Sequence, residues 1–142
     1  MKKAIYPGSF DPIHEGHVNI IEKASKLFDE VHVIISLNIN KNNTLNSNER
    51  KELVLSKIKH LTNVFVDINE SILTTEQAKK LNAKYLIRGL RSQDDFNYEV
   101  QYYDGIKALD DNLEIVYFIS DEEKRTLSSS ILKEIEHFKK RE

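Results

Sequence analysis

Five short apolar runs divide the chain at fairly even intervals. Each is rich in β-branched or aromatic residues, which favours a β-strand. Several are nearly continuous rather than alternating, which is typical of strands that are buried on both faces. The runs are AIYPG (4–8), VHVIISL (31–37), VFVDI (64–68), KYLIRG (84–89) and LEIVYFIS (113–120).

The stretches between these runs show helical periodicity. Asn46 with Glu49, and Thr74 with Gln77, are spaced as capping boxes that would open a second and a third helix, the third running through Leu81. A fourth helix is expected from about residue 94 to 109, and a fifth within LSSSILKEIEHFKK. One buried face of the first helix would carry Ile20, Ile21, Ala24, Leu27 and Phe28, and one side of the fifth would carry Ile131, Leu132, Ile135 and Phe138.

Strands that alternate with helices predict right-handed crossovers and a parallel sheet. The expected fold is α/β: a Rossmann-like, doubly wound, five-stranded parallel sheet with helices on both faces. The elements fill residues 1–142 without a linker, so a single domain is expected. In such sheets ligands bind beyond the carboxyl ends of the strands, where the strand order reverses.

Composition narrows the possible functions. The net charge of −2 provides no basic face for nucleic acid or an anionic membrane. Cysteine is absent, which excludes disulfides, thiolate metal sites and a cysteine nucleophile. The N-terminus has no long apolar segment and no window is apolar enough to span a bilayer, so we expect a cytoplasmic protein without a signal peptide.

The stretch YPGSFDPIHEGH (6–17) follows the first strand and contains both prolines of the chain. Gly8 allows a ligand to approach the backbone, and the first helix would begin near Glu15 or Gly16 with its N–H groups free to bind an anion. His14 and His17 share one side of its first turn, where neutral rings can each donate an N–H to phosphate. HEGH lacks the spacing of a zinc-binding HExxH motif, and no protein metal site is expected.

Other predicted strands also end in groups suited to phosphate. Arg88 and Arg91 follow the fourth strand and offer forked donors. Three serines, 128–130, stand at the start of the last helix, and Lys41 is the only cation in the loop LNINKNN. GxxxxGK[ST] and GxGxxG motifs are absent, which argues against a P-loop hydrolase and a dinucleotide-binding dehydrogenase.

Together these segments resemble the nucleotidyltransferase superfamily with T/HxGH and ISSS-type motifs. Within it, the chain is similar over nearly its whole length to the bacterial phosphopantetheine adenylyltransferases. The matching segments are YPGSFDPIHEGH, NERKEL, YLIRGLR, DFNYEVQ and LSSSILKE, in the order and at the spacing of that family. RGLR together with DFNYE is the specific part, because HxGH alone fits several nucleotidyltransferases.

The resemblance implies a single nucleotidyltransferase domain that joins ATP to 4′-phosphopantetheine, giving dephospho-coenzyme A and pyrophosphate. This is the penultimate step of coenzyme A synthesis. It also implies Mg²⁺ held mainly by ATP phosphates and water, a homohexamer, and coenzyme A as a feedback ligand. The implied catalytic residues are His17, Lys41 and Arg91. Phosphopantetheine contacts are expected at Ser9, Lys41, Thr74 and Arg88, and ATP contacts at Ser9, Phe10, His14, His17, Gly89, Leu90, Arg91, Glu99, Lys124, Arg125, Thr126, Leu127, Ser128, Ser129 and Ser130.

Two alternatives accompany this interpretation. A sister enzyme, such as a nicotinamide mononucleotide adenylyltransferase or a glycerol-3-phosphate cytidylyltransferase, would share HxGH, but RGLR and DFNYE argue against both. A nucleotide-binding regulatory protein on the same fold would have lost catalysis, and His17, Lys41, Arg88 and Arg91 argue against that.

Overall fold

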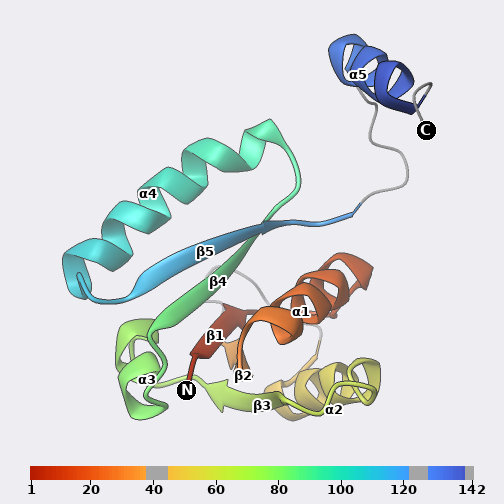
Figure 1. Ribbon diagram of the computed structural model, residues 1–142. Helices are drawn as coiled ribbons and strands as arrows, with labels where there is room; N and C mark the ends of the chain where they lie inside the picture. The colour runs from red at the N-terminus through yellow and green to blue at the C-terminus, as the bar shows by residue number, and fades with distance from the viewer. Residues whose placement is uncertain (38–44, 122–127, 140–142) are drawn as a thin grey trace.

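The computed structural model describes residues 1–37, 45–121 and 128–139. Five parallel strands form one sheet in the order β3-β2-β1-β4-β5 (Figure 1), as the apolar runs predict. The strands are β1 (Lys3–Gly8), β2 (Glu30–Ser36), β3 (Val64–Asn69), β4 (Tyr85–Leu90) and β5 (Glu114–Ile119), and the helices are α1 (Glu15–Leu27), α2 (Ser47–Lys57), α3 (Thr74–Lys80), α4 (Gln93–Leu109) and α5 (Ser129–Lys139).

The sheet carries a separate apolar cluster on each face, which confirms the doubly wound α/β prediction. On one face, Ile21 of α1 and Val54 of α2 pack against Val33 of β2. On the other, Ala78 of α3 and Ile106 of α4 join a cluster with strand residues that include Ile34 of β2 and Leu86 of β4. Burial on both faces accounts for the nearly continuous apolar runs in the sequence.

β1 and β4 lie side by side but pair over only a short length. Their register holds at Ala4↔Tyr85 and Ile5↔Leu86. By contrast, β1 pairs with β2 from Lys3↔Glu30 to Gly8↔Ile35. The carboxyl ends of β1 and β4 are therefore not paired with each other, at the point where the strand order reverses. This is where an open parallel sheet binds its ligands.

The C-terminal end of α1 is fastened to the sheet by Asn63, which immediately precedes β3. Its Nδ2 donates to the carbonyl oxygen of Ser25 at 2.9 Å and to that of Phe28 at 3.0 Å. These carbonyls lie where a helix runs out of internal donors. The bonds fix the direction of α1, whose opposite end carries the two histidines.

Two local predictions are wrong. Thr74 is the first residue of α3 rather than its cap, because Leu73 occupies the N-cap position without a side-chain hydrogen bond. Leu27, predicted on the buried face of α1, is 63% exposed, whereas Phe28 beyond the helix is buried. The Asn46 prediction is confirmed, since its Oδ1 accepts the backbone N–H of Glu49 at 2.8 Å.

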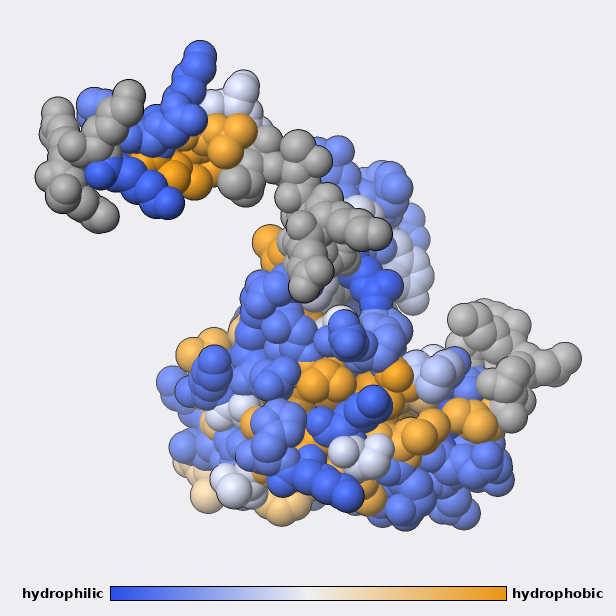
Figure 2. All heavy atoms as spheres, turned by 90° about the vertical axis from the view of Figure 1, so that its right-hand side faces the viewer, coloured by the Kyte–Doolittle hydropathy of each residue, from blue (hydrophilic) through white to orange (hydrophobic). Residues whose placement is uncertain are grey.

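α5 stands away from the sheet (Figure 1). The side chains predicted to share one side of it are all 39% exposed or more. They form an apolar stripe between hydrophilic residues, visible on the helix that projects at the top of Figure 2. The stripe consists of Ile131, Leu132, Ile135 and Phe138. None of the helices in the described part of the chain is both long and apolar enough to cross a membrane.

Replacing Asn63 by alanine should loosen the attachment of α1. The change removes the two hydrogen bonds to Ser25 and Phe28. We expect the free energy of unfolding to fall by about 1–3 kcal/mol, as measured by urea denaturation. Asn112→Ala, at an exposed position, is the control. Equal stabilities of the two variants would contradict a role for Asn63 in holding α1.

Candidate active site

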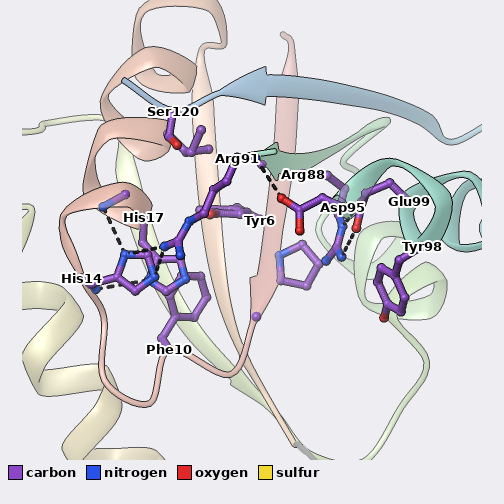
Figure 3. A pocket seen from close by; sticks show the side chains of 15 residues that line it. Tyr6, Phe10, His14, His17, Arg88, Arg91, Asp95, Tyr98, Glu99 and Ser120 are labelled. Atoms are coloured by element: carbon purple, nitrogen blue, oxygen red, sulfur yellow. Dashed lines mark hydrogen bonds and ion pairs between the residues drawn. The ribbon is translucent and has the colours of Figure 1, made fainter. Parts of the chain in front are cut away.

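A pocket of about 400 Å³ opens at the carboxyl ends of β1 and β4, between α1 and α4 (Figure 3). Its position agrees with the binding site expected for this sheet topology. Both arginines and both histidines singled out by the sequence reach it. The lining residues are Tyr6, Pro7, Gly8, Phe10, His14, Gly16, His17, Ile20, Arg88, Gly89, Arg91, Asp95, Tyr98, Glu99 and Ser120.

The two histidines themselves cap the first turn of α1. Nδ1 of His14 accepts the backbone N–H of Gly16 at 3.1 Å, and Nδ1 of His17 accepts the backbone N–H of His14 at 3.2 Å. This reciprocal arrangement is a capping box built from imidazoles. It stacks the rings with centroids 3.7 Å apart. The local sequence HEGH therefore fixes the orientation of both rings.

The surroundings keep both rings neutral. Burial, with smaller contributions from the neighbouring His14 and Arg91, lowers the pKa of His17 to about 4. The pKa of His14 is also lowered, first by burial and then by Arg91. Because Nδ1 of His17 is an acceptor, the single proton of that neutral ring resides on Nε2. His17 thus offers the pocket one N–H donor without a charge.

Arg91 lies against the histidine pair. Its Nη2 is 2.9 Å from Nδ1 of His14 and also contacts Nε2 of that ring. Gly16 makes this approach possible, since a Cβ there would stand 3.0 Å from the same Nη2 atom. Asp95 holds the turn from which Arg91 projects, because its Oδ2 accepts the backbone N–H of Arg91 at 2.9 Å and that of Ser92 at 3.2 Å.

Arg88 is clamped from two sides. Its Nε and Nη2 donate to the two carboxylate oxygens of Glu99 at 2.8 and 2.7 Å. The ring of Tyr102 lies 4.0 Å from the guanidinium carbon. Burial opposes the charge, but the bonds to Glu99 prevail and raise the pKa of Arg88. The clamp holds a permanent cation in a fixed plane beside the pocket.

Phe10 has an unusual backbone conformation. Its φ is 47°, in the left-handed region, which costs about 1–3 kcal/mol for a bulky residue. The side chain is almost fully buried, and its ring packs edge-on against His17 at 4.9 Å. Gly8 leaves the ring its space, because a Cβ there would lie 3.0 Å from Phe10 Cε2. The turn after β1 therefore places an aromatic wall behind the histidine.

Not every residue predicted for the site lies in this pocket. Leu90 lines a neighbouring apolar hollow with Phe96. Ser9 and Thr74 do not line the pocket. The exposed serines 128–130 stand with α5, away from the pocket. Ser128 Oγ accepts the N–H of Ile131 at 3.3 Å, the capping role expected of one serine. Lys41, Lys124, Arg125, Thr126 and Leu127 lie outside the described residues.

Several lining residues were not predicted as site residues, although Tyr6 lies in the segment YPGSFDPIHEGH and Asp95 and Tyr98 lie in DFNYE. Tyr6 is buried on the α1 face of β1, and burial raises its pKa to about 12, so its hydroxyl stays protonated. Asp95, Tyr98 and Ser120 also reach the pocket. Asp95 could have been found from its place three residues after Ser92, the spacing of a capping box.

The described residues include no group of three histidine or carboxylate side chains that could hold a metal ion. The two carboxylates that line the pocket are already engaged. Glu99 accepts from Arg88, and Asp95 accepts from the backbone of its own turn. The described part of the pocket therefore does not provide a metal cage of its own.

Comparison with known proteins places the fold and the family. The cytidylyltransferase-like family matches residues 5–135. A solved nicotinic acid mononucleotide adenylyltransferase from Plasmodium falciparum, complexed with NaAD, superimposes with a TM-score of 0.64 at 23% identity. The match covers 94% of this chain and 71% of that one, and at this identity it shows a shared fold.

Two curated relatives are closer in sequence, and both are named phosphopantetheine adenylyltransferase. The protein from Mycoplasma capricolum subsp. capricolum is 58% identical over 99% of this chain and 100% of its own length. The protein from Staphylococcus haemolyticus is 41% identical over 96% of this chain and 84% of its own. With this coverage and a histidine-capped pocket at the switch point, the chain belongs to the phosphopantetheine adenylyltransferase family of cytidylyltransferase-like nucleotidyltransferases.

Proposed function

We propose that the pocket transfers the adenylyl group of ATP to 4′-phosphopantetheine, releasing pyrophosphate and forming dephospho-coenzyme A in the penultimate step of coenzyme A synthesis. The observation that carries the proposal is the neutral pair His14 and His17 at the N-terminus of α1, which shares one pocket with Arg88 and Arg91. Relatives that match nearly the whole chain bear this enzyme's name.

The chemistry suits a site without a general base. The nucleophile is an oxygen of a phosphate monoester, whose second pKa is about 6, so it is ionised at neutral pH. It attacks the α-phosphorus of ATP, the new P–O bond forms, and the bond to the β-phosphate oxygen breaks as pyrophosphate leaves. The site must bring two anions together and stabilise the charge that develops on the α-phosphate oxygens.

We assign to His17 the stabilisation of the charge that develops on the α-phosphate oxygens. Its Nε2–H can donate to an α-phosphate oxygen, while its Nδ1 stays bonded to the backbone of His14. The positive end of the α1 dipole adds a favourable potential for the same phosphate. A neutral donor loses no proton in the reaction, so His17 is ready for each turnover in a single protonation state.

The two arginines are assigned to different phosphates. Arg88, held in plane by Glu99 and Tyr102, is suited to the phosphate of phosphopantetheine. Arg91 already contacts His14 and can exchange that contact for the β- and γ-phosphates of ATP. Lys41, Ser9, Thr74, Glu99 and residues 124–130 stay predictions as ligand contacts, with Lys41 offsetting the repulsion between the two substrates.

Mg²⁺ belongs to the proposal as a companion of ATP. Since the described residues form no cage for it, phosphate oxygens and water would hold the ion, as is usual for this metal. When bound, Mg²⁺ neutralises part of the phosphate charge. We further propose a cytoplasmic homohexamer with coenzyme A as feedback ligand, on the strength of the family alone.

The assignment predicts which acceptor supports turnover. Pyrophosphate release from ATP and Mg²⁺ should occur with 4′-phosphopantetheine and not with nicotinamide mononucleotide or without an acceptor. His17→Ala should lower kcat by about 10²–10³-fold, because a preorganised donor to the transition state is lost. Turnover with nicotinamide mononucleotide would indicate the sister enzyme, and ATP binding without any turnover would indicate a nucleotide sensor.

The protonation state of His17 can be measured directly. Its ring ¹⁵N signals should show a neutral Nε2–H tautomer from about pH 5.5 to 8 and titrate only near pH 4. Because the unfolded chain binds this proton more readily, the free energy of unfolding should also fall as the pH drops from 6.5 towards about 4. Titration of His17 near pH 6.5 would refute the neutral-donor role.

Arg88→Lys tests the clamped guanidinium. Lysine keeps the charge but loses the two-pronged bond to Glu99, so the KM for phosphopantetheine should rise by roughly tenfold or more. The KM for ATP should change much less, which steady-state kinetics will separate. Lys80→Met, at an exposed position on α3, is the control. An equal rise in both KM values would argue against the separate assignment of Arg88.

A further inference from the structure

Arg50 of α2 is one of the most deeply buried side chains in the protein, at 1% exposure. Its guanidinium faces two backbone oxygens: Nη1 donates to the carbonyl of Ser9 at 2.8 Å and to that of Ser36 at 3.2 Å. Nε has no hydrogen-bond partner. Within the described residues no carboxylate forms an ion pair with it. A buried cation held this way is costly, which makes stability alone a poor explanation for it.

The first of these bonds acts on the strained turn after β1. The Ser9 carbonyl belongs to the peptide unit that joins Ser9 to Phe10, and the orientation of that unit is linked to the φ angle of Phe10. That angle is 47°, a value that bulky residues avoid and that needs support from its surroundings. Arg50 supplies that support by holding the carbonyl in place.

The turn after β1 also positions His17. The Phe10 ring is buried between Tyr6, at 5.4 Å and nearly perpendicular, and His17, at 4.9 Å. If the Phe10 backbone left its left-handed conformation, the Phe10 ring would move and His17 would lose this packing contact. The second bond of Arg50, to Ser36 at the end of β2, ties the same guanidinium to the neighbouring strand.

We propose that Arg50 is a positioning residue for adenylyl transfer: through the Ser9 carbonyl it holds Phe10 in its left-handed conformation and so keeps His17 aligned with the pocket. The inference rests on the proposed function of His17 as the α-phosphate donor. Arg50 does not line the pocket, and its guanidinium bonds to backbone carbonyls. It acts from beneath the site, from a helix that carries none of the pocket residues.

Arg50→Met tests the proposal in the full chain. Methionine removes the donors but fills apolar space, and it also removes the cost of burying a charge. We expect kcat to fall roughly 10–100-fold with a much smaller change in the KM for ATP, as for a misplaced catalytic group. Arg50→Lys, which restores the charge and one donor, should recover part of kcat.

A matched control separates positioning from loss of stability. Val54→Ala lies one turn further along α2 and is fully buried in the same apolar cluster as Phe10, but valine has no donor that could hold the Ser9 carbonyl. It should lower the unfolding midpoint while leaving kcat close to that of the unaltered chain. If Val54→Ala and Arg50→Met lose activity in proportion to their lost stability, Arg50 has only a structural role and the proposal fails.

Histidine NMR gives a readout that does not depend on turnover. In Arg50→Met the ring of His17 should become more exposed, so its pKa should rise from about 4 towards 6.5. His14 and Arg91 still face the ring in the variant, which leaves burial by Phe10 as the contribution that changes. Unchanged His17 signals would overturn the proposal. If the unaltered chain transfers no adenylyl group, the proposed function fails, but this titration still decides whether Arg50 positions His17.

Discussion

The short pairing between β1 and β4 is the constraint on which the site depends. After Ile5↔Leu86 the two strands no longer bond to each other, and the helices that follow them lie on opposite faces of the sheet. A crevice at this point is a consequence of topology, since the chain reverses direction across the sheet here. The two histidines and two arginines to which the proposed chemistry is assigned reach the crevice from a strand end or from the first turn of the next helix.

Within this crevice, the same side chains satisfy backbone hydrogen bonds and face the pocket. His14 and His17 use one ring nitrogen each to satisfy free N–H groups of α1, and this leaves the orientation of His17 no freedom. The carboxylates that line the pocket likewise accept hydrogen bonds from Arg88 and from the turn that carries Arg91. The result is a site with fixed cations and neutral donors, suited to two polyanionic substrates.

The sequence was informative where a feature depends on local pattern. The short apolar runs and their β-branched and aromatic residues predicted all five strands. The residues that follow these strands predicted where Arg88, Arg91 and the histidines would meet. The role of Arg50 could not be predicted from the sequence. Its partners Ser9 and Ser36 are 41 and 14 residues away, and it bonds to their backbone carbonyls, which every residue has. The pairing of Arg88 with Glu99 was missed for a similar reason: it joins a strand to a helix across a turn. The exposure of Leu27 depends on tertiary packing, which periodicity alone cannot supply.

The tyrosines around Arg88 have a practical consequence. The chain has six tyrosines and no tryptophan, so tyrosine is its only strongly fluorescent side chain. Tyr6 and Tyr98 line the pocket, Tyr102 covers the guanidinium, and the Tyr117 hydroxyl donates to the Glu99 carbonyl at 3.2 Å. Four of the six tyrosines therefore lie in or beside the pocket. Occupancy of the site can be followed optically in the unlabelled protein, without attaching a dye that would disturb it.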